Sequence, residues 1–192
     1  MRVPLSFYSR SALEVAPELI GAFLVHHSRE GITSGRIVEA EAYRGEDDPA
    51  SFAWRGRTPK SERLYGPPGK AFIYLNYGIH WLLNVVTETE DFPGAVLIRA
   101  VEPGEGISLM EQRRKTRERK NLCSGPAKTC EAFGLDGTFN GVPLHSLRSS
   151  LFIEKNYPHQ EELVWRPRVG IREGKDRLWR VYIKNNRYIS CR

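Results

Sequence analysis

The chain has 192 residues, enough for a substantial core but too few for a second full domain, so we expect a single domain over residues 1–192. Its 29 Lys and Arg against 23 Asp and Glu give a formal charge of +6, which favours an anionic partner without identifying it. Three cysteines without CxxC spacing give no support to a disulfide framework or a zinc site, and the lack of a long apolar run predicts an intracellular protein, neither secreted nor in a membrane.

The N-terminal part of the chain predicts one helix followed by two paired strands. Residues 11–20 carry recurring apolar positions between a serine cap and Gly21, which is typical of a short helix. Residues 22–27 and 34–42 predict strands on either side of a turn. The second of these alternates in a period of two, as a half-buried strand does.

The middle of the chain predicts a long loop and a hairpin. Residues 45–69 are rich in Gly, Pro and charge, a composition typical of a functional loop. Aromatic and apolar runs at 71–77 and 81–87 flank a turn and predict a β-hairpin. A further strand is expected at 96–101.

The C-terminal part predicts two helices and two closing strands. Helices are expected at 105–119 and at 126–133, the second between a Gly-Pro start and a glycine stop. Residues 136–162 are expected to be irregular, and 168–172 and 178–184 to be strands. The whole pattern predicts an α+β fold: a curved, mainly antiparallel sheet flanked by helices, with a protruding hairpin.

Basic residues gather in two segments of the sequence. One segment belongs to the predicted loop and the other to the predicted helix at 105–119. Each is explained equally well as a solvated surface or as a face for an anionic partner. The two clusters are Arg55, Arg57, Lys60, Arg63 and Lys70, and Arg113, Arg114, Lys115, Arg117, Arg119 and Lys120.

Glu41 is the candidate catalytic carboxylate, and strand alternation places it on the same face as Tyr43. Hydrolysis of a bond with a good leaving group, such as a purine glycosidic bond, needs one carboxylate near the sugar carbon. That carboxylate takes a proton from a held water and favours the positive charge that develops. A Glu on a strand is also commonly a surface or ion-paired residue, so spacing alone leaves both interpretations open.

Aromatic residues could form a flat slot for one unstacked base and a wedge for the gap it leaves. Tyr43, Phe52, Tyr74 and Tyr77 are candidates, although aromatic residues in strands usually belong to the core. Tyr77 differs because Gly78 follows it at the predicted hairpin tip. There its ring could project outward as a minor-groove wedge.

Asn84 and Arg99 lie within apolar strands, where an unpaired polar group is costly, so each needs a partner. One explanation is structural, for example a salt bridge between Arg99 and Glu102. The other is functional, with Arg99 placing a water and Asn84 testing the edge of a base. The residues themselves do not choose between the two.

Five ordered stretches of this chain resemble the alkyladenine DNA glycosylases, also called 3-methyladenine DNA glycosylases. The stretches are 35–43 (GRIVEAEAY), 74–84 (YLNYGIHWLLN), 97–103 (LIRAVEP), 122–128 (LCSGPAK) and 168–170 (RVG). They occur in family order, so the resemblance covers almost the whole chain. It implies a monomer with access to DNA, cytoplasmic in a bacterium, that uses no metal or organic cofactor and acts on double-stranded DNA.

The resemblance implies a monofunctional glycosylase of base excision repair. It would flip an alkylated or deaminated purine, such as 3-methyladenine, hypoxanthine or ethenoadenine, and hydrolyse its N-glycosidic bond with water. Glu41 would be the general base, while Arg99 and the backbone carbonyl of Val169 would hold the same water.

The resemblance also implies how damaged DNA is held. Tyr43 and Tyr74 would stack on the two faces of the flipped base, and Asn84 would crowd the amine of normal guanine. Tyr77 would take the place of the extruded nucleotide, with Ile79 and His80 beside it on the hairpin. Thr58 and Lys60 would touch the phosphate backbone.

Phe52 stands where the family usually has His, and it would also contact the base. Phe can stack and can offer its backbone N–H, but it lacks the hydrogen bond of an imidazole. The effect of Phe52 on the choice between lesions is therefore open, and so is its effect on the rate of base removal. Two alternatives to the glycosylase also stay open: a damaged-DNA-binding protein whose turnover is weak or lost through Phe52, and a general RNA-binding domain suggested only by charge and aromatic content.

Overall fold

The computed structural model describes residues 1–155 and 161–190. Within this part of the chain, eight strands form one antiparallel sheet with the path β3-β4-β5-β2-β1-β6, and β8 pairs with both β2 and β7. The strands are β1 (Phe23–Ser28), β2 (Gly31–Tyr43), β3 (Ala71–Asn76), β4 (His80–Thr87), β5 (Gly94–Pro103), β6 (Leu151–Glu154), β7 (Leu163–Arg166) and β8 (Arg180–Ile183). The helices are α1 (Leu5–Tyr8), α2 (Ala12–Leu19), α3 (Ile107–Arg114) and α4 (Pro126–Phe133), with 3-10 turns at Glu62–Tyr65, Arg119–Asn121 and Gly137–Phe139. The predicted α+β class is confirmed.

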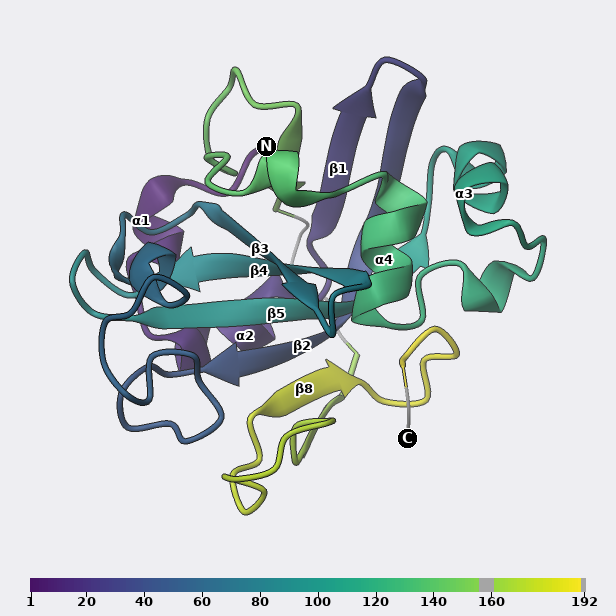
Figure 1. Cartoon of the computed structure of the whole chain (residues 1–192). Helices are drawn as coiled ribbons and strands as arrows, with labels where there is room; N and C mark the ends of the chain where they lie inside the picture. Colours follow the sequence, from purple (N-terminus) through teal and green to yellow (C-terminus); the bar gives the residue numbers. More distant parts are fainter. Residues whose placement is uncertain (156–160, 191–192) are drawn as a thin grey trace.

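Strand β2 is the longest strand and gives the sheet its curvature. Its pairing with β5 shifts register on both sides of Glu39, which marks a bulge. A bulge bends a strand and increases its twist. Figure 1 shows β2 leaving the direction of β1 and turning to lie along β5. The bulge also interrupts the predicted alternation, because Ile37 and Val38 are both fully buried in the apolar core.

Two helices cover the sheet and close the main core. The N-terminal end of α2 is capped by Ser11, whose hydroxyl accepts a hydrogen bond from the N–H of Leu13. Figure 1 places α2 behind β2 and β5, and α4 beside the end of β4. Helix α4 has the bounds expected from the sequence and ends where Gly134 adopts a φ of +66°. Its residues Cys130 and Phe133 are buried in the same core as α2.

The structure corrects three expectations about the second half of the chain. Helix α3 is shorter than 105–119, because Lys115 adopts a left-handed φ of 51° and ends it. Residues 168–172 are not a strand; the strand before them is β7, and Gly170 has a φ of +76° that breaks extended backbone. The region expected to be irregular contains β6, which pairs with β1, although residues 156–160 of that region lie outside the described residues.

No helix in the described ranges is long and apolar enough to cross a membrane. The same ranges contain no group of three or more His, Cys, Asp or Glu side chains placed to hold a metal ion. Cys123 and Cys130 are buried free thiols, and Cys191 lies outside the described residues.

Candidate active site

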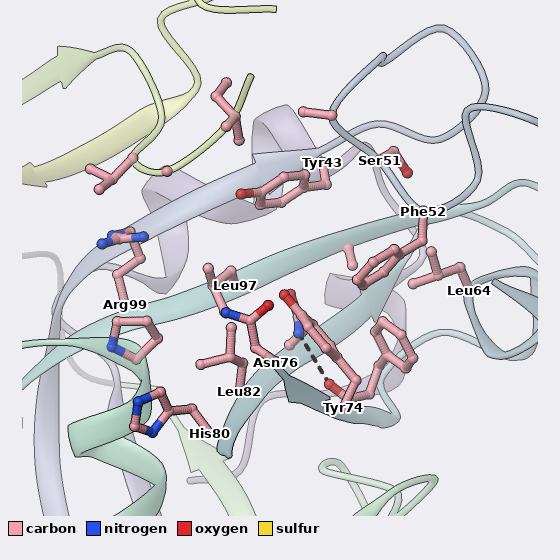
Figure 2. Close-up of a pocket in the computed structure, with 18 of the residues that line it drawn as sticks. Tyr43, Ser51, Phe52, Leu64, Tyr74, Asn76, His80, Leu82, Leu97 and Arg99 are labelled. Atoms are coloured by element: carbon pink, nitrogen blue, oxygen red, sulfur yellow. Dashed lines mark hydrogen bonds between the residues drawn. The ribbon is translucent and has the colours of Figure 1, made fainter. Parts of the chain in front are cut away.

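A cavity of about 560 Å³ opens next to β5, between the 45–69 loop, the β3–β4 hairpin and residues 169–173. Figure 2 shows Tyr43 across the cavity from Tyr74, with Phe52 at one end and Arg99 at the other. The cavity brings together most of the residues predicted to act on the base, which come from different strands and loops: Tyr43, Phe52, Tyr74, Asn84, Arg99 and Val169.

Glu41 lies directly behind this cavity, in β2, and its side chain is fully buried. Three groups that line the cavity contact its carboxylate. Oε1 accepts a hydrogen bond of 2.7 Å from the backbone N–H of Val169 and lies 3.4 Å from Nη1 of Arg99, and Oε2 accepts one of 2.9 Å from the hydroxyl of Tyr43. Glu41 is therefore one layer of side chains away from the empty space, on the cavity side of the sheet.

Burial raises the pKa of the Glu41 carboxyl above its ordinary value, because an ion is poorly solvated inside the protein. The Arg99 guanidinium, the Val169 N–H and the Tyr43 hydroxyl oppose that rise by stabilising the anion. Burial also raises the pKa of the Tyr43 phenol, and the neighbouring Glu41 charge adds to this effect, so Tyr43 donates its proton in the hydrogen bond. A carboxylate with a raised pKa is a stronger proton acceptor than an exposed glutamate.

Aromatic rings form one wall of the cavity. The ring of Phe52 meets that of Tyr74 edge-on, with centroids 4.7 Å apart, and meets that of Phe72 at 6.1 Å. Phe52 and Tyr74 pack on a small second core formed by buried residues of the loop and of strands β3, β4 and β5. That core fixes the wall to the sheet, although Phe52 itself comes from a stretch of the loop without regular secondary structure.

Asn84 lies on β4 at the floor of the cavity and is buried. Its Nδ2 donates to the carbonyl of Phe72 across the β3–β4 pairing, at 3.2 Å. This hydrogen bond supplies the structural partner that a buried amide needs. It also fixes the side chain that lines the cavity, so both interpretations of Asn84 are compatible with its position.

The β3–β4 hairpin exposes apolar side chains at its tip. Tyr77 is 85% exposed, and Ile79 is 71% exposed. Tyr77 and His80 also line the rim of the cavity. The tip therefore presents an aromatic ring to the solvent beside the cavity, and its role as a wedge stays a prediction.

The two residues predicted to touch phosphate lie on the loop next to Phe52. Nζ of the exposed Lys60 is 4.1 Å from the centroid of the Phe52 ring, so the cation lies against the outside of the aromatic wall. Thr58 and Ser61 share hydrogen bonds that shape the turn. Within the basic clusters several arginines have acidic partners: Arg57 with Glu62 and Asp91, Arg113 with Glu30, and Arg114 with Glu131.

Sequence reasoning missed a buried salt bridge behind the site. The guanidinium of Arg168 donates to both carboxylate oxygens of Asp48, at 2.5 and 2.7 Å, and to the carbonyl of Ala42 at 3.0 Å. Both side chains are fully buried. The pair fastens the loop and the backbone of Val169 to β2. No local signal in the sequence indicates a contact between positions this far apart.

The partners of Arg99 differ from the structural alternative drawn from sequence. Arg99 lies between two carboxylates of β2, those of Glu39 and Glu41. Glu102 instead accepts hydrogen bonds from Arg36, the shorter of which is 2.7 Å. The suggested pairing of Arg99 with Glu102 is wrong, because the two residues are three positions apart on β5 and side chains at such spacing point to opposite faces of a strand.

Comparisons with known proteins agree on one family. A family model described as methylpurine-DNA glycosylase matches residues 6–187. A protein of Clostridium acetobutylicum is 44% identical over 99% of this chain and 98% of its own length. Proteins of Salinibacter ruber and Rhodopseudomonas palustris are also 44% identical, over 98% and 96% of this chain and 96% and 85% of their own lengths. All three carry the provisional name 3-methyladenine DNA glycosylase.

These comparisons define the class of the protein, a DNA N-glycosylase and hence a hydrolase. Its substrate is damaged DNA, and it acts in the repair of alkylation damage. More narrowly, the chain belongs to the methylpurine-DNA glycosylase family, as the resemblance of its sequence predicted.

Proposed function

We propose that this chain is a monofunctional glycosylase that removes 3-methyladenine, and with it related alkylated or deaminated purines, from double-stranded DNA. The observation that carries the proposal is the buried carboxylate of Glu41, held by three donors behind an aromatic cavity. A cationic purine suits a cavity bounded by Tyr43 and Tyr74, because a cation is attracted to an aromatic face by about 0.5 to 2 kcal/mol. Weak pairing of the lesion in the duplex lowers the free energy of flipping it.

In the proposed reaction, Glu41 accepts a proton from a water molecule as the water oxygen attacks C1′ of the flipped nucleotide. The bond from C1′ to the purine nitrogen breaks, and its electron pair leaves with the base. A 3-methyladenine cation thereby departs as a neutral molecule. The products are the free base and an abasic sugar in an unbroken strand.

The water reaches Glu41 between Tyr43, Arg99 and the backbone of Val169, the three groups that separate the carboxylate from the cavity. An ionised carboxylate has about four lone-pair sites, so the present donors leave room for a water. The contact made by Val169 in the free protein is its N–H on Glu41. A role for its carbonyl in holding the water stays a prediction.

On the DNA side, Tyr77 would fill the gap in the duplex, with Ile79 and His80 beside it. Thr58 and Lys60 would touch the phosphate backbone. Within the described residues no lysine lines the cavity, which agrees with hydrolysis by water and not through a Schiff base.

A duplex with one 3-methyladenine tests the proposal. After incubation, hot alkali breaks the strand wherever the base has been removed. We expect cleavage with the native chain, and none with Glu41→Gln, which should still bind the lesion. Glu131→Gln, an exposed carboxylate of α4 paired with Arg114, is the control and should cleave normally. Strands that stay intact with the native chain, for hypoxanthine and ethenoadenine as well, would refute the glycosylase and favour a damage-binding protein.

A further inference from the structure

A second buried carboxylate shares the arginine that contacts Glu41. Nε of Arg99 lies 3.3 Å from Oε1 of Glu39, and Nη1 of the same guanidinium lies 3.4 Å from Oε1 of Glu41. Both glutamate side chains are fully buried, and that of Arg99 is 8% exposed. In this environment two carboxylates compete for one cation, since charge interactions are stronger inside a protein than in water.

Glu39 is held more firmly than Glu41, and by different parts of the chain. Its Oε1 accepts from Nη1 of Arg180 at 3.1 Å and from the hydroxyl of Ser190 at 3.0 Å, and its Oε2 accepts from the N–H of Ser190 at 2.6 Å. The Ser190 hydroxyl also accepts from Arg99, at 3.1 and 3.3 Å. Glu39 therefore anchors one side of the Arg99 guanidinium to β8 and to the C-terminal segment.

The local fold explains why this arrangement forms. Glu39 lies at the bulge of β2, where it is opposite Ala100 of β5 and Tyr182 of β8. One carboxylate can thus reach an arginine on each neighbouring strand, Arg99 and Arg180. Two residues further along, Glu41 contacts a different nitrogen of the same guanidinium, Nη1.

We propose that Glu39 is a positioning residue for the hydrolysis: it fixes Arg99 between the two carboxylates and takes up part of its positive charge, so that Glu41 keeps the basicity it needs to accept a proton from water. The inference rests on the proposed function of Glu41. An arginine paired with Glu41 alone would neutralise the general base. An arginine without Glu39 would also lose the anchor that keeps it beside the reacting water.

The charged and titratable groups around Glu41 agree in sign with this role. Arg99 from β5 lowers the pKa of Glu41, and Tyr43 on β2 and the N–H of Val169 do the same by hydrogen bonding. Glu39 raises that pKa by repulsion between the two negative charges. Two further groups face the site without touching Glu41: Arg168 lies over the ring of Tyr43, and burial raises the pKa of Tyr74 to about 12, so that phenol stays neutral.

Glu39→Gln tests the proposal, with single-turnover base release measured against pH on the 3-methyladenine duplex. Without the negative charge of Glu39, the positive charge of Arg99 stabilises the Glu41 anion more strongly. We therefore expect the acid limb of the profile to move to lower pH. The plateau rate should fall by about three- to tenfold, because a weaker base accepts the proton less readily. Glu39→Asp keeps the charge and should hold the acid limb at its native position.

Other outcomes would overturn the proposal. An acid limb that stays in place in Glu39→Gln, or moves to higher pH, while the fold and lesion binding are intact, would show that Glu39 has only a structural role. Should Glu39→Gln not fold, Ser190→Ala carries the test, since it removes a donor to Glu39 and an acceptor from Arg99. A rate at least about twofold below native with unchanged lesion affinity would then support the proposal, and native kinetics would overturn it. Failure of the proposed function itself is distinct, because the native chain would then release no base at any pH.

Discussion

Asp48 and Arg168, which stand 120 positions apart in the sequence, form a salt bridge in which both side chains are fully buried. The same guanidinium donates to the carbonyl of Ala42, next to Glu41 on β2. This contact joins three segments: the loop that carries Phe52, the strand that carries Glu41, and the turn whose N–H at Val169 reaches the Glu41 carboxylate. The pair thus ties the loop of the aromatic wall, and the turn that contacts the Glu41 carboxylate, to strand β2.

Replacing Asp48 with Asn should lower the free energy of unfolding by about 3 to 5 kcal/mol, because it leaves the Arg168 charge buried without a counter-charge. Urea denaturation measures this. Asp47→Asn is the control, since Asp47 forms an exposed ion pair with Arg44 and its loss should change stability by less than about 1 kcal/mol. Equal effects of the two substitutions would contradict the importance of the buried pair.

The rate of base release should have an acid limb set by Glu41. Glu41 acts as a base only when ionised, and its pKa is raised by burial. As the pH decreases, activity should therefore begin to fall at a pH above the ordinary pKa of an exposed glutamate, which is about 4.3. An acid limb at or below that ordinary value would show that Glu41 is not the titrating base.

Tyr43→Phe should move this acid limb further toward neutral pH. The substitution keeps the ring that lines the cavity but removes the hydroxyl that stabilises the Glu41 anion. A hydrogen bond to a charged group of typical strength corresponds to a shift of roughly one to two pH units. Tyr65→Phe removes a hydroxyl that donates to Glu46, outside the Glu41 network, and should leave the profile unchanged.

Tyr77→Ser should weaken binding to lesion-bearing duplex and slow base release, because no side chain then fills the gap left by the flipped nucleotide. Stability should not change, since Tyr77 is 85% exposed. Leu147→Ser is a matched control at a position that is also 85% exposed. Fluorescence anisotropy with matched and lesion-bearing duplexes separates the two variants, and equal losses in both would count against a wedge.

Phe52→His should increase activity toward hypoxanthine by about two- to tenfold, the gain expected from one neutral hydrogen bond. In the native chain this wall consists of the rings of Phe52, Phe72 and Tyr74. The imidazole in place of Phe52 adds a nitrogen that can form a hydrogen bond with the base. Base release from a hypoxanthine duplex measures the effect. Phe92→His, at an exposed loop position outside the cavity, is the control. A Phe52→His variant without any gain would show that this position does not limit lesion choice.

Elements whose limits depend on neighbouring residues were predictable from the sequence. Helix α4 begins at Pro126 and ends before Gly134, because proline suits a helix start and glycine accepts the left-handed conformation at its end. The β3–β4 hairpin was predictable for a similar reason, since its apolar strands flank a turn that contains Gly78.

Elements that depend on a distant partner were not predictable. Strand β6 has four residues and exists because Leu151 to Glu154 pair with β1, whose residues occur much earlier in the chain. The stretch around Arg168 contains apolar and basic residues that resemble a strand. The buried salt bridge between Arg168 and Asp48 instead holds this stretch against the loop and β2.

By itself, the sequence determined that Glu41 and Tyr43 share a face of one strand, since side chains two residues apart on a strand point the same way. Only the tertiary structure decided what surrounds Glu41: an arginine from β5 shared with Glu39, and a backbone N–H from a residue 128 positions away. The physical reason is that burial and neighbouring charges set the basicity of a carboxylate. Those neighbours come together only when the sheet curves and the loops pack against it.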